Sequence, residues 1–333
     1  MGKILVTGGA GYIGSHVVKC LGEEGFEIVV YDNLSTGRRE NVLFGEFVEG
    51  HLEDQDSIEQ LFKDNQFVGV LHFAGSIVVP DSVSDPLSYY SNNTVNSFRV
   101  INLCKKYGVP NFIFSSTAAV YGMLEDGVAD EQAKTSPINP YGHSKLMTEQ
   151  MLKDTSFAHE QFNYIALRYF NVSGADPSGQ IGQCFPGATH LIKVACETAL
   201  GKREGMKVFG TDYETADGTC IRDYIHVQDL AMAHVNALKY LLVNKKSHIL
   251  NCGYGTGFSV NEVLNIVKEI SGVDFRVELA PRRPGDASVV MSKCGKIKEV
   301  LGWEPKYQSL KIIVETALNW EKKLGELDAR VRS

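Results

Sequence analysis

Tyr141 and Lys145 lie four residues apart in the stretch P-Y-G-H-S-K, and a phenol beside an ammonium can serve as a general base. Pro140 is placed to begin a helix, so both side chains project from one helical face. The positive charge favours the phenolate and lowers a pKa that is about 10 in an unperturbed tyrosine. The plainer interpretation is an ordinary amphipathic pair on a helix.

Thr117 adds a hydroxyl to the same candidate site. It follows an apolar, strand-like run in the stretch F-S-S-T-A-A-V-Y-G. Its hydroxyl can bridge a substrate hydroxyl and the oxygen of Tyr141, and the alternative role is a turn cap. Two histidines are weaker candidates. His143 lies on a different helical face from Tyr141, and His226 in Y-I-H-V is expected to begin a helix and to pack or cap.

The elements that must position these groups begin near the N-terminus. In Lys3–His16, K-I-L-V-T-G-G-A-G-Y-I-G-S-H, a β-branched run leads directly into glycines, which indicates strand, tight turn and helix. Gly9, Gly11 and Gly14 fit the dinucleotide fingerprint, in which phosphates bind at the helix N-terminus. Asp32 follows at about the 20-residue spacing of a carboxylate that binds a ribose diol and repels a 2′-phosphate. If the motif binds a dinucleotide, NAD is therefore favoured over NADP. The alternative interpretation of the motif is a structural turn followed by a surface Asp.

Apolar runs alternate with segments of helical pattern over the first half of the chain, which is typical of βαβ units. The predicted fold class is α/β: a Rossmann-type, doubly wound parallel sheet with a smaller mixed α/β domain. The cofactor domain is expected at residues 1–171, with a return segment near 226–252, and the substrate domain at 172–333. A Gly/Pro-rich tract at 174–187 indicates a long loop that leaves the first domain.

Composition narrows the choice of partners and location. The 333 residues include 33 Lys and Arg against 40 Asp and Glu, a formal net charge of -7, which gives no electrostatic reason to expect nucleic acid or an anionic membrane as partner. The seven cysteines are widely spaced, which argues against a disulfide framework or a C-x-x-C metal site. We expect a cytoplasmic protein with reduced thiols and no metal, because the sequence also suggests no signal peptide and no membrane-spanning run.

Further motifs follow one another along nearly the whole chain. They are T-G-G-A-G-Y-I-G-S-H, Y-D-N-L-S-T-G, H-F-A-G, P-L-x-Y-Y-x-N-N, F-S-S-T-A-A-V-Y-G, P-Y-G-H-S-K, L-R-Y-F-N-V-S-G-A, F-G-T-D-Y, D-G-T-x-x-R-D-Y-I-H-V-x-D-L-A and A-P-R-R-P-G-D. In this order and spacing the chain resembles the extended short-chain dehydrogenase/reductase family. Within that family it is most similar to the members that invert C4 of the hexose in UDP-glucose and UDP-galactose.

The resemblance implies an NAD-dependent carbohydrate epimerase of galactose metabolism with a UDP-hexose as substrate. In this scheme Tyr141 takes the 4-hydroxyl proton while hydride leaves C4, and the transient 4-keto sugar receives hydride on its other face. Lys145 holds the cofactor ribose and tunes Tyr141, and Thr117 shares the proton path. NAD is retained in each cycle. Relatives pair through two long helices, here 87–107 and 141–153, so a homodimer is expected.

The resemblance also implies two sets of binding residues. The cofactor-binding positions, besides Tyr141 and Lys145, are Gly8, Gly11, Tyr12, Ile13, Gly14, Asp32, Asn33, His51, Leu52, Phe73, Ala74, Gly75, Asn93, Ser115 and Phe170. The substrate-binding positions, besides Thr117 and Tyr141, are Asn171, His190, Leu191, Phe209, Arg222, Arg283, Asp286 and Val290.

In this scheme Phe209 stacks near uracil, and Arg222 and Arg283 bind the diphosphate as bidentate donors. Without the resemblance, the plainer interpretations are core packing for Phe209 and an ion pair of Arg222 with Asp223 or Asp229.

Four positions depart from the family pattern. His51 stands where relatives carry an Asp that reaches the adenine amino group, so a weaker or backbone-assisted contact is expected there. Ile77 replaces a Lys near the cofactor phosphates, which removes one charge contact, and Thr117 replaces a Ser but keeps the hydroxyl. Val290 stands where some relatives restricted to plain hexoses carry a Tyr. Valine leaves room for a 2-acetamido group, so epimerisation of UDP-GlcNAc and UDP-GalNAc is a hypothesis.

Other functions on the same fold are alternatives. A nucleotide-sugar 4,6-dehydratase needs an acid and a base beside the Thr, where Ala118 and Ala119 stand here. A UDP-glucuronate epimerase needs a cation aimed at the sugar carboxylate, and we identify no motif for one. A non-catalytic NAD-binding protein is the third alternative, and the retention of Thr117, Tyr141 and Lys145 together argues against it.

Overall fold

Short aliphatic and β-branched runs form a parallel sheet at the centre of the fold. Within residues 2–283 and 285–332, which the computed structural model describes, this sheet has seven strands in the order β11-β7-β5-β4-β1-β2-β3. The strands are β1 (Lys3–Thr7), β2 (Ile28–Asp32), β3 (Glu46–Glu49), β4 (Phe67–His72), β5 (Asn111–Thr117), β7 (Asn163–Tyr169) and β11 (His248–Cys252). All their pairings are parallel, so the predicted α/β class with a doubly wound parallel sheet is confirmed.

The strand order reverses at β1. After β1 the chain adds β2 and β3 on one side, and it then crosses to β4 on the other side of β1. The connections that leave β1 and β4 therefore diverge, and ligands of open α/β sheets bind at such a point. Thr7 at the end of β1 pairs with His72 at the end of β4, so the glycine turn and the loop 73–75 start side by side.

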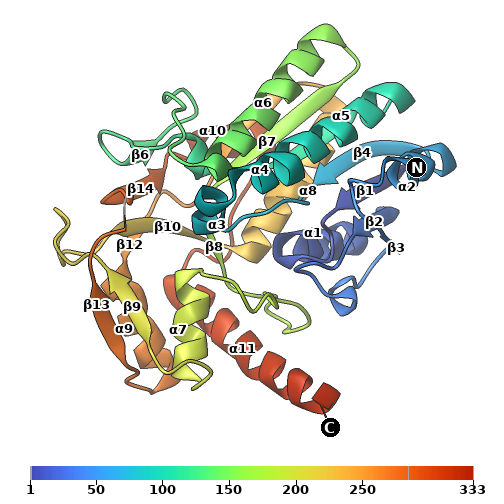
Figure 1. Ribbon diagram of the computed structural model, residues 1–333. Helices are drawn as coiled ribbons and strands as arrows, with labels where there is room; N and C mark the ends of the chain where they lie inside the picture. The colour runs from blue at the N-terminus through green and yellow to red at the C-terminus, as the bar shows by residue number, and fades with distance from the viewer. Residues whose placement is uncertain (1, 284, 333) are drawn as a thin grey trace.

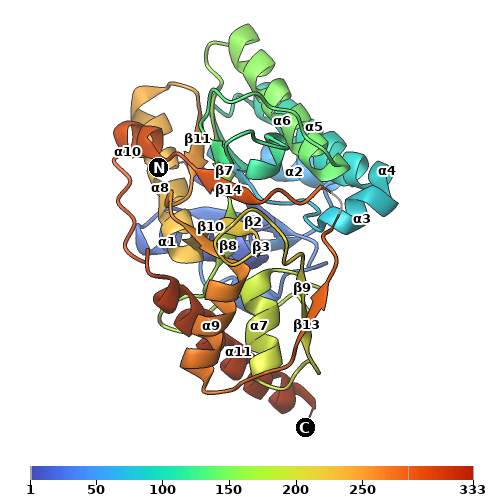
Figure 2. The same ribbon diagram turned by 90° about the vertical axis from the view of Figure 1, so that its left-hand side faces the viewer.

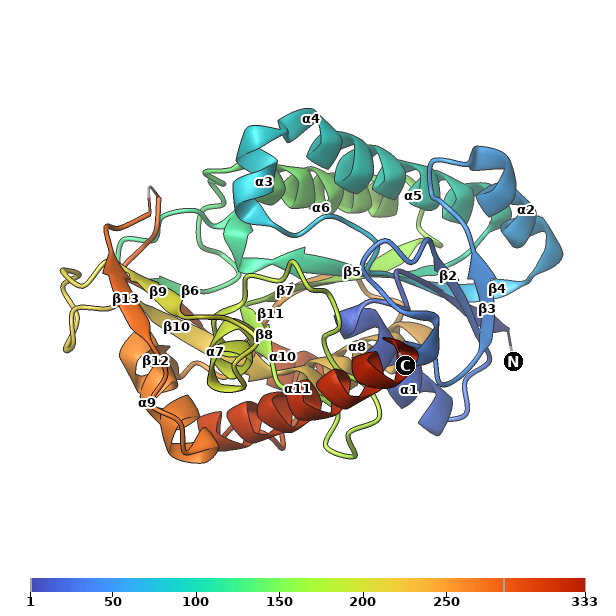
Figure 3. The same cartoon turned by 60° about the horizontal axis from the view of Figure 1, so that its bottom comes forward.

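Alternate residues of each strand pack on opposite faces of this sheet. Ile4 and Val6 belong to the core on one face, and Leu5 belongs to the core on the other. The first face is covered by α1 (Tyr12–Glu23) and α8 (Val227–Asn244), and the second by α2 (Gln55–Asp64), α5 (Asn96–Tyr107) and α6 (Pro140–Ala158) (Figure 1). Figure 3 shows these two helical layers on either side of the strands.

The connection from β4 to α5 is helical but irregular. α3 (Val79–Ser84) and α4 (Pro86–Tyr89) lead through a π-helical segment, Tyr90–Val95, directly into α5. The helix expected at 87–107 is therefore present without a gap, and it contains a π-helical segment of the kind that is frequent at functional sites. Single 3-10 turns occur at Arg39–Asn41 and Ala118–Val120.

A smaller sheet continues from the carboxyl end of β7, because β8 (Asn171–Ser173) follows β7 after one residue. Its other strands are β6 (Val128–Ala129), β10 (Ile221–His226), β12 (Gly257–Ser259) and β14 (Val289–Ser292). The order is β12-β10-β14-β6, with β8 also paired to β10, and only the β10-β12 pairing among them is antiparallel, so this sheet is mixed. A separate parallel pair joins β9 (Met206–Phe209) to β13 (Val277–Ala280).

Helices α7 (Leu191–Ala199), α9 (Val260–Ser271) and α11 (Leu310–Arg332) pack against one another below this sheet, and α10 (Gly295–Leu301) contacts β11 (Figure 2). None of the helices in the described ranges is both long and apolar enough to cross a bilayer.

The chain passes between the two sheets more than once. β10 continues without a break into α8, which packs on α1, and β11 then joins the large sheet beside β7. The loop after β5 of the large sheet contributes β6 to the smaller sheet, where β6 pairs with β14. Residues that belong to the two sheets therefore interleave along the sequence.

Candidate active site

The glycine turn after β1 is packed so closely that side chains are excluded. Gly8 has a positive φ of 72°, and a Cβ there would lie 2.5 Å from the backbone nitrogen of Ala74. A Cβ on Gly14 would lie 2.2 Å from the carbonyl oxygen of Gly8. Gly11 is the N-cap of α1 and brings no side chain to the first turn, so the helix N-terminus can donate its N–H groups to an anion.

Asp32 ties the end of β2 to this turn. Its carboxylate oxygens accept hydrogen bonds from the backbone nitrogens of Ala10 at 2.9 Å and Leu34 at 2.8 Å. Burial raises the pKa of Asp32, and these backbone donors oppose the rise. Asp32 is buried and not on the surface, whereas its bonds to Ala10 and Leu34 are those of a structural turn, so its contact with a ribose diol stays a prediction.

Two first-turn residues of α1 connect the glycine turn to the rest of the protein. Tyr12 donates from its hydroxyl to the carbonyl oxygen of Gly174, 2.6 Å away, just after β8. Ile13 packs against the core under the sheet. The N-terminus of α1 is thus joined directly to the smaller sheet.

His51, the residue predicted to lie near the adenine of the cofactor, is more exposed to solvent than the glycine turn. Asn33 and His51 approach each other at 3.3 Å between Nδ2 and Nδ1, and the His51 side chain is exposed. The hydroxyl of Tyr31 donates to the carbonyl oxygen of His51 at 3.1 Å, which fixes its backbone, while Leu52 packs into the core.

Asn93, in the π-helical segment, joins the loop after β4 to α6. Its amide oxygen accepts from the backbone nitrogen of Ser76 at 2.7 Å, and its amide nitrogen donates to the hydroxyl of Ser144 at 3.0 Å. A Cβ on Gly75 would lie 3.0 Å from the Asn93 oxygen and 3.6 Å from Nζ of Lys145. Ser76 and Ser144 were missed by the sequence analysis, because nothing in the sequence marks them as neighbours of Asn93.

The other loop residues lie around this point. The ring of Phe73 contacts the ring of His234, with centroids 4.9 Å apart, and Ala74 packs against the core on the α5 side. Ile77 is exposed.

Thr117 and Tyr141 are brought together at the carboxyl end of β5. The Thr117 side chain lies near enough to the Tyr141 phenol to influence its pKa, and the Thr117 hydroxyl accepts from the backbone nitrogen of Ala119 at 3.1 Å. The turn cap is therefore confirmed for Thr117, and the bridging of a substrate hydroxyl and the Tyr141 oxygen by its hydroxyl stays a prediction. Helix α6 begins here because Asn139 caps it, accepting from the backbone nitrogen of Gly142 at 2.8 Å.

Lys145 is buried one turn further along α6. It is 3% exposed, its Nζ donates to the carbonyl oxygen of Ser115 at 3.0 Å, and it lies 5.0 Å from the centre of the Phe114 ring. Burial lowers the pKa of Lys145 to about 8. The hydroxyl of Ser115 is itself hydrogen-bonded to that of Tyr169.

The expected pKa shift of Tyr141 is wrong for the polypeptide itself. Burial raises the pKa of the phenol, and the hydrogen bond from Thr117 only partly opposes this. The reason is that burial disfavours a charge on the phenol, and the Lys145 ammonium is directed to the Ser115 carbonyl.

A second cluster lies at the end of β9. The guanidinium of Arg283 sits 4.9 Å from the centre of the Phe209 ring. Asp286 bridges both predicted arginines, accepting from Nε of Arg283 at 2.9 Å and pairing with Nη2 of Arg222 at 3.7 Å. The plainer interpretation of Phe209 as a core residue is therefore incomplete, because its face carries a cation.

The expected alternative partners of Arg222 have other roles. Asp223 accepts hydrogen bonds from the backbone of Tyr254 at 3.0 Å and Ser292 at 3.1 Å. Asp229 accepts from the backbone nitrogens of Lys306 and Tyr307, both at 2.8 Å. The ion pair of Arg222 with Asp223 or Asp229 is wrong, and the partner is Asp286.

His190 is the N-cap of α7, next to Leu191, which packs against the core. Its Nδ1 lies 3.1 Å from the side-chain nitrogen of Gln183, and burial lowers its pKa. Gln183 was missed because it lies in the Gly/Pro-rich tract, where no periodic pattern marks a buried residue. Asn171 begins β8 and pairs with Tyr224 across β8 and β10.

Val290 lies close to the catalytic candidates. It pairs with Arg222 across β14 and β10, and it packs in a small cluster with Phe170 and Ala118. Since Ala118 follows Thr117, this cluster joins the Thr117 turn to the Arg222 strand.

The two histidines behave as expected. His143 is exposed, and His226 caps α8 by accepting at Nδ1 from the backbone nitrogen of Gln228, 3.1 Å away. The His226 ring stacks on Tyr307 with centroids 4.7 Å apart. Across the described residues, no group of three or more His, Cys, Asp or Glu is arranged to hold a metal ion.

A dinucleotide-type glycine turn, a doubly wound sheet and a Tyr-x-x-x-Lys helix beside a Thr together define the short-chain dehydrogenase/reductase class. Comparison with known families narrows this further. Residues 4–253 match the NAD dependent epimerase/dehydratase family, and the chain belongs to that family.

Individual relatives agree with this assignment. The chain is 52% identical over 325 residues to a UDP-glucose 4-epimerase of Azospirillum brasilense, covering 97% of this chain and 93% of the relative. It is similar to the UDP-glucose 4-epimerase of Brucella ovis solved in complex with NAD, with a TM-score of 0.93, 42% identity, and coverage of 96% and 98% of the two chains. The UDP-Glc/GlcNAc 4-epimerase of Campylobacter jejuni matches with a TM-score of 0.86, 49% identity, and coverage of 97% and 100%.

Proposed function

We propose that this protein interconverts UDP-glucose and UDP-galactose by reversible inversion at C4, through a transient 4-keto sugar, with NAD as cofactor. The observation that carries the proposal is the placement of Thr117 beside the Tyr141 phenol at the end of β5, with Lys145 one turn along the same helix. UDP-glucose 4-epimerases from several bacteria match nearly the whole chain.

The residues around the glycine turn fit NAD. The turn leaves no room for Cβ atoms at Gly8 and Gly14, so backbone can approach a pyrophosphate, and the N-terminus of α1 faces the same space. Asp32 is the acceptor for the ribose diol, and Asn93 and Lys145 hold the nicotinamide side. When bound, NAD supplies the hydride acceptor and donor, and its cationic ring has the sign needed to lower the pKa of Tyr141.

Tyr141 is the general base for the 4-hydroxyl of the sugar and returns the proton in the second half of the cycle. Thr117, which lies beside the phenol, passes the proton between the sugar hydroxyl and Tyr141. Lys145, whose pKa burial lowers to about 8, keeps donors directed at the cofactor ribose and the Ser115 carbonyl.

The nucleotide of the substrate is held away from this centre. Phe209, with the Arg283 guanidinium over its ring, stacks near uracil. When the substrate binds, its diphosphate replaces Asp286 as the partner of Arg222 and Arg283. Asn171, His190 and Leu191 complete the UDP site. Firm anchoring through UDP leaves the sugar free to present either face, as inversion requires.

The substrate range extends to UDP-GlcNAc and UDP-GalNAc. Val290 is a small side chain beside the Thr117 turn, where a Tyr would fill the space for a 2-acetamido group. The Campylobacter jejuni relative is itself a UDP-Glc/GlcNAc 4-epimerase. A 4,6-dehydratase is disfavoured, because Ala118 and Ala119 offer no acid or base beside Thr117.

The protein acts as a homodimer through α4, α5 and α6. Large apolar side chains are exposed on these helices, with Leu87 at 76% and Phe98 at 54%, and Met147 on α6 is also exposed. Burial of such a patch favours association of two copies. Gel filtration with light scattering checks the mass.

A cytoplasmic location stays a prediction from the sequence. All seven cysteines are free thiols, and six of them are buried. Buried reduced thiols support a reducing compartment.

The decisive experiment is incubation of the purified protein with UDP-galactose, with and without added NAD, and chromatographic detection of UDP-glucose. Conversion supports the proposal, and UDP-GalNAc in a parallel reaction tests the wider range. Absence of UDP-glucose in the presence of NAD overturns the assignment.

A further inference from the structure

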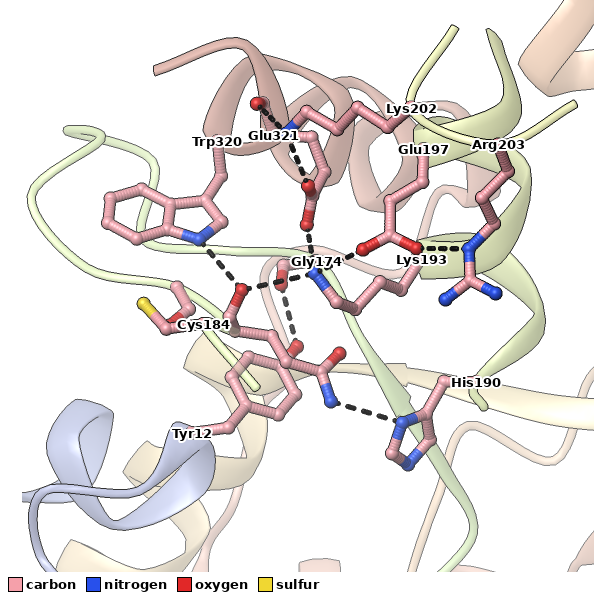
Figure 4. Close-up of polar contacts among 12 residues, drawn as sticks. Tyr12, Gly174, Cys184, His190, Lys193, Glu197, Lys202, Arg203, Trp320 and Glu321 are labelled. Carbon is pink, nitrogen blue, oxygen red and sulfur yellow. Dashed lines mark hydrogen bonds and ion pairs between the residues drawn. The ribbon is translucent and has the colours of Figure 1, made fainter. Parts of the chain in front are cut away.

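A group of buried charges lies directly behind the N-terminal end of α7. Lys193 on α7 and Glu321 on α11 are 6% and 2% exposed and form an ion pair. Lys193 also contacts Glu197 at 3.1 Å, and Glu321 also binds Lys202 at 2.9 Å (Figure 4). Charges this deeply buried are tolerated only when they are paired.

Gln183 connects this ion pair to His190. The carbonyl oxygen of Gln183 accepts from the indole nitrogen of Trp320 at 3.1 Å and from Nζ of Lys193 at 3.5 Å. The side chain of Gln183 contacts the ring of His190 at 3.1 Å. A continuous set of polar contacts therefore runs from Glu321 through Lys193 and Gln183 to His190.

The same place borders the cofactor side. A small cavity of about 20 Å³ is lined by Tyr12, His190, Lys193, Trp320 and Glu321 among others. Tyr12 is the first residue of α1, so the cavity separates the helix that faces the cofactor from the helix that begins at His190.

We propose that the Glu321–Lys193 pair fixes the N-terminal end of α7 and, through Gln183, the ring of His190, so that Glu321 is a positioning residue for the substrate nucleotide. This inference rests on the proposed function, in which His190 and Leu191 contact UDP. A buried ion pair contributes little net stability compared with apolar residues of the same shape, and in some proteins such a pair selects one arrangement of the groups around it. In this proposal Glu321 acts through its ion pair with Lys193 on α7.

The test compares Glu321→Gln with the wild-type protein. We expect KM for UDP-galactose and the dissociation constant of UDP to rise together by about three- to tenfold, as coupled buried contacts do, with kcat and NAD retention nearly unchanged. The matched control is Lys311→Met. Lys311 lies on α11, as Glu321 does, and its substitution removes an exposed ion pair with Glu269, so none of these values should change.

Gln183→Leu provides an independent test, because this substitution leaves the buried ion pair of Lys193 and Glu321 in place. It keeps the carbonyl contacts to Trp320 and Lys193 and removes only the link to His190. It should weaken UDP binding in the same sense as Glu321→Gln. If Glu321→Gln fails to fold, Gln183→Leu decides the matter.

The outcomes separate the two proposals. Wild-type protein that neither binds UDP nor converts UDP-galactose rejects the proposed function. Wild-type protein that does both, with folded Glu321→Gln or Gln183→Leu binding UDP normally, rejects the positioning role. A fall in kcat at constant KM also rejects it, because that pattern places the effect in the chemical step.

Discussion

Lys145 donates from Nζ to the backbone carbonyl oxygen of Ser115 across 3.0 Å and so fastens α6 to the end of β5. Two residues later on β5, the Thr117 side chain lies beside the Tyr141 phenol of the same helix. The positions of phenol and ammonium are therefore set by the packing of one helix on one strand. Glu149, one turn beyond Lys145, strengthens this contact through Arg168 on β7 and the Ser116 hydroxyl.

Tyr141→Phe should lower kcat by about 100- to 10,000-fold, the usual contribution of a positioned general acid–base group. The ring remains, so helix α6 and NAD binding should be preserved. The experiment measures the turnover of UDP-galactose and the amount of NAD that stays bound to the purified variant. Full activity in the variant would show that another group takes the proton.

The buried Lys145 should make folding stability depend on pH in a defined direction. Burial lowers its pKa to about 8 in the folded polypeptide, against about 10.4 in an unfolded chain. Between these values the unfolded state binds more protons, so stability from this group rises as pH increases from about 8 to about 10.

The measurement is the difference in the free energy of unfolding between wild type and Lys145→Met, taken without NAD across that range. The free energy of unfolding of the wild type, relative to that of the variant, should increase with pH. The contributions of the other titrating groups are the same in both proteins and cancel in the difference. A difference that is independent of pH would contradict the desolvation of Lys145.

Arg283→Lys should raise the KM for UDP-galactose about tenfold or more, because a hydrogen bond to a charged group contributes about 1.5–3 kcal/mol and lysine cannot donate two parallel bonds. The neighbouring residue is the control. Arg282 pairs with Asp212 at 2.7 Å and lies over the ring of Tyr213, whereas Arg283 pairs with Asp286 and lies over the ring of Phe209. Equal effects of Arg282→Lys and Arg283→Lys on UDP binding would refute the assignment of the diphosphate site.

Gly14→Ala should destabilise the protein by about 2 kcal/mol or more and abolish NAD retention, since the new Cβ meets the Gly8 carbonyl oxygen at 2.2 Å. Gly295→Ala is the matched control. No atom lies within 4 Å of a Cβ at that position, and the substitution should be neutral or stabilise by up to about 1 kcal/mol. Urea unfolding and NAD content distinguish the two variants, and retention of NAD by Gly14→Ala would argue against a close backbone approach.

Val290→Tyr should lower turnover of UDP-GalNAc by about tenfold or more relative to UDP-galactose, because the larger ring fills the space beside Ala118 and Phe170. The ratio of kcat/KM for the two sugars is the quantity to compare. An unchanged ratio would mean that the acetamido group lies elsewhere.

Much of the candidate site could be predicted because its signals are local. The glycine turn after β1, the Pro140 start of α6 and the Thr117 strand end each depend on a few adjacent residues, and the structure brings Thr117 and Tyr141 together as expected. The doubly wound sheet followed from alternation of apolar runs and helical patterns.

The remaining features depend on contacts between distant parts of the chain. The bridge that Asp286 makes between Arg222 and Arg283, and the contact between Gln183 and His190, have no local pattern. The pKa of Tyr141 was predicted in the wrong direction because spacing reveals a neighbouring charge but not the loss of solvent around the phenol.

The late return of β11 to the edge of the large sheet has a consequence for engineering. A fragment cut after residue 171 would lack both α8 and β11, leaving β7 with an unpaired edge and α1 with an uncovered apolar side. The smaller sheet would in turn lack β6, so division of the chain at this point would leave neither sheet whole.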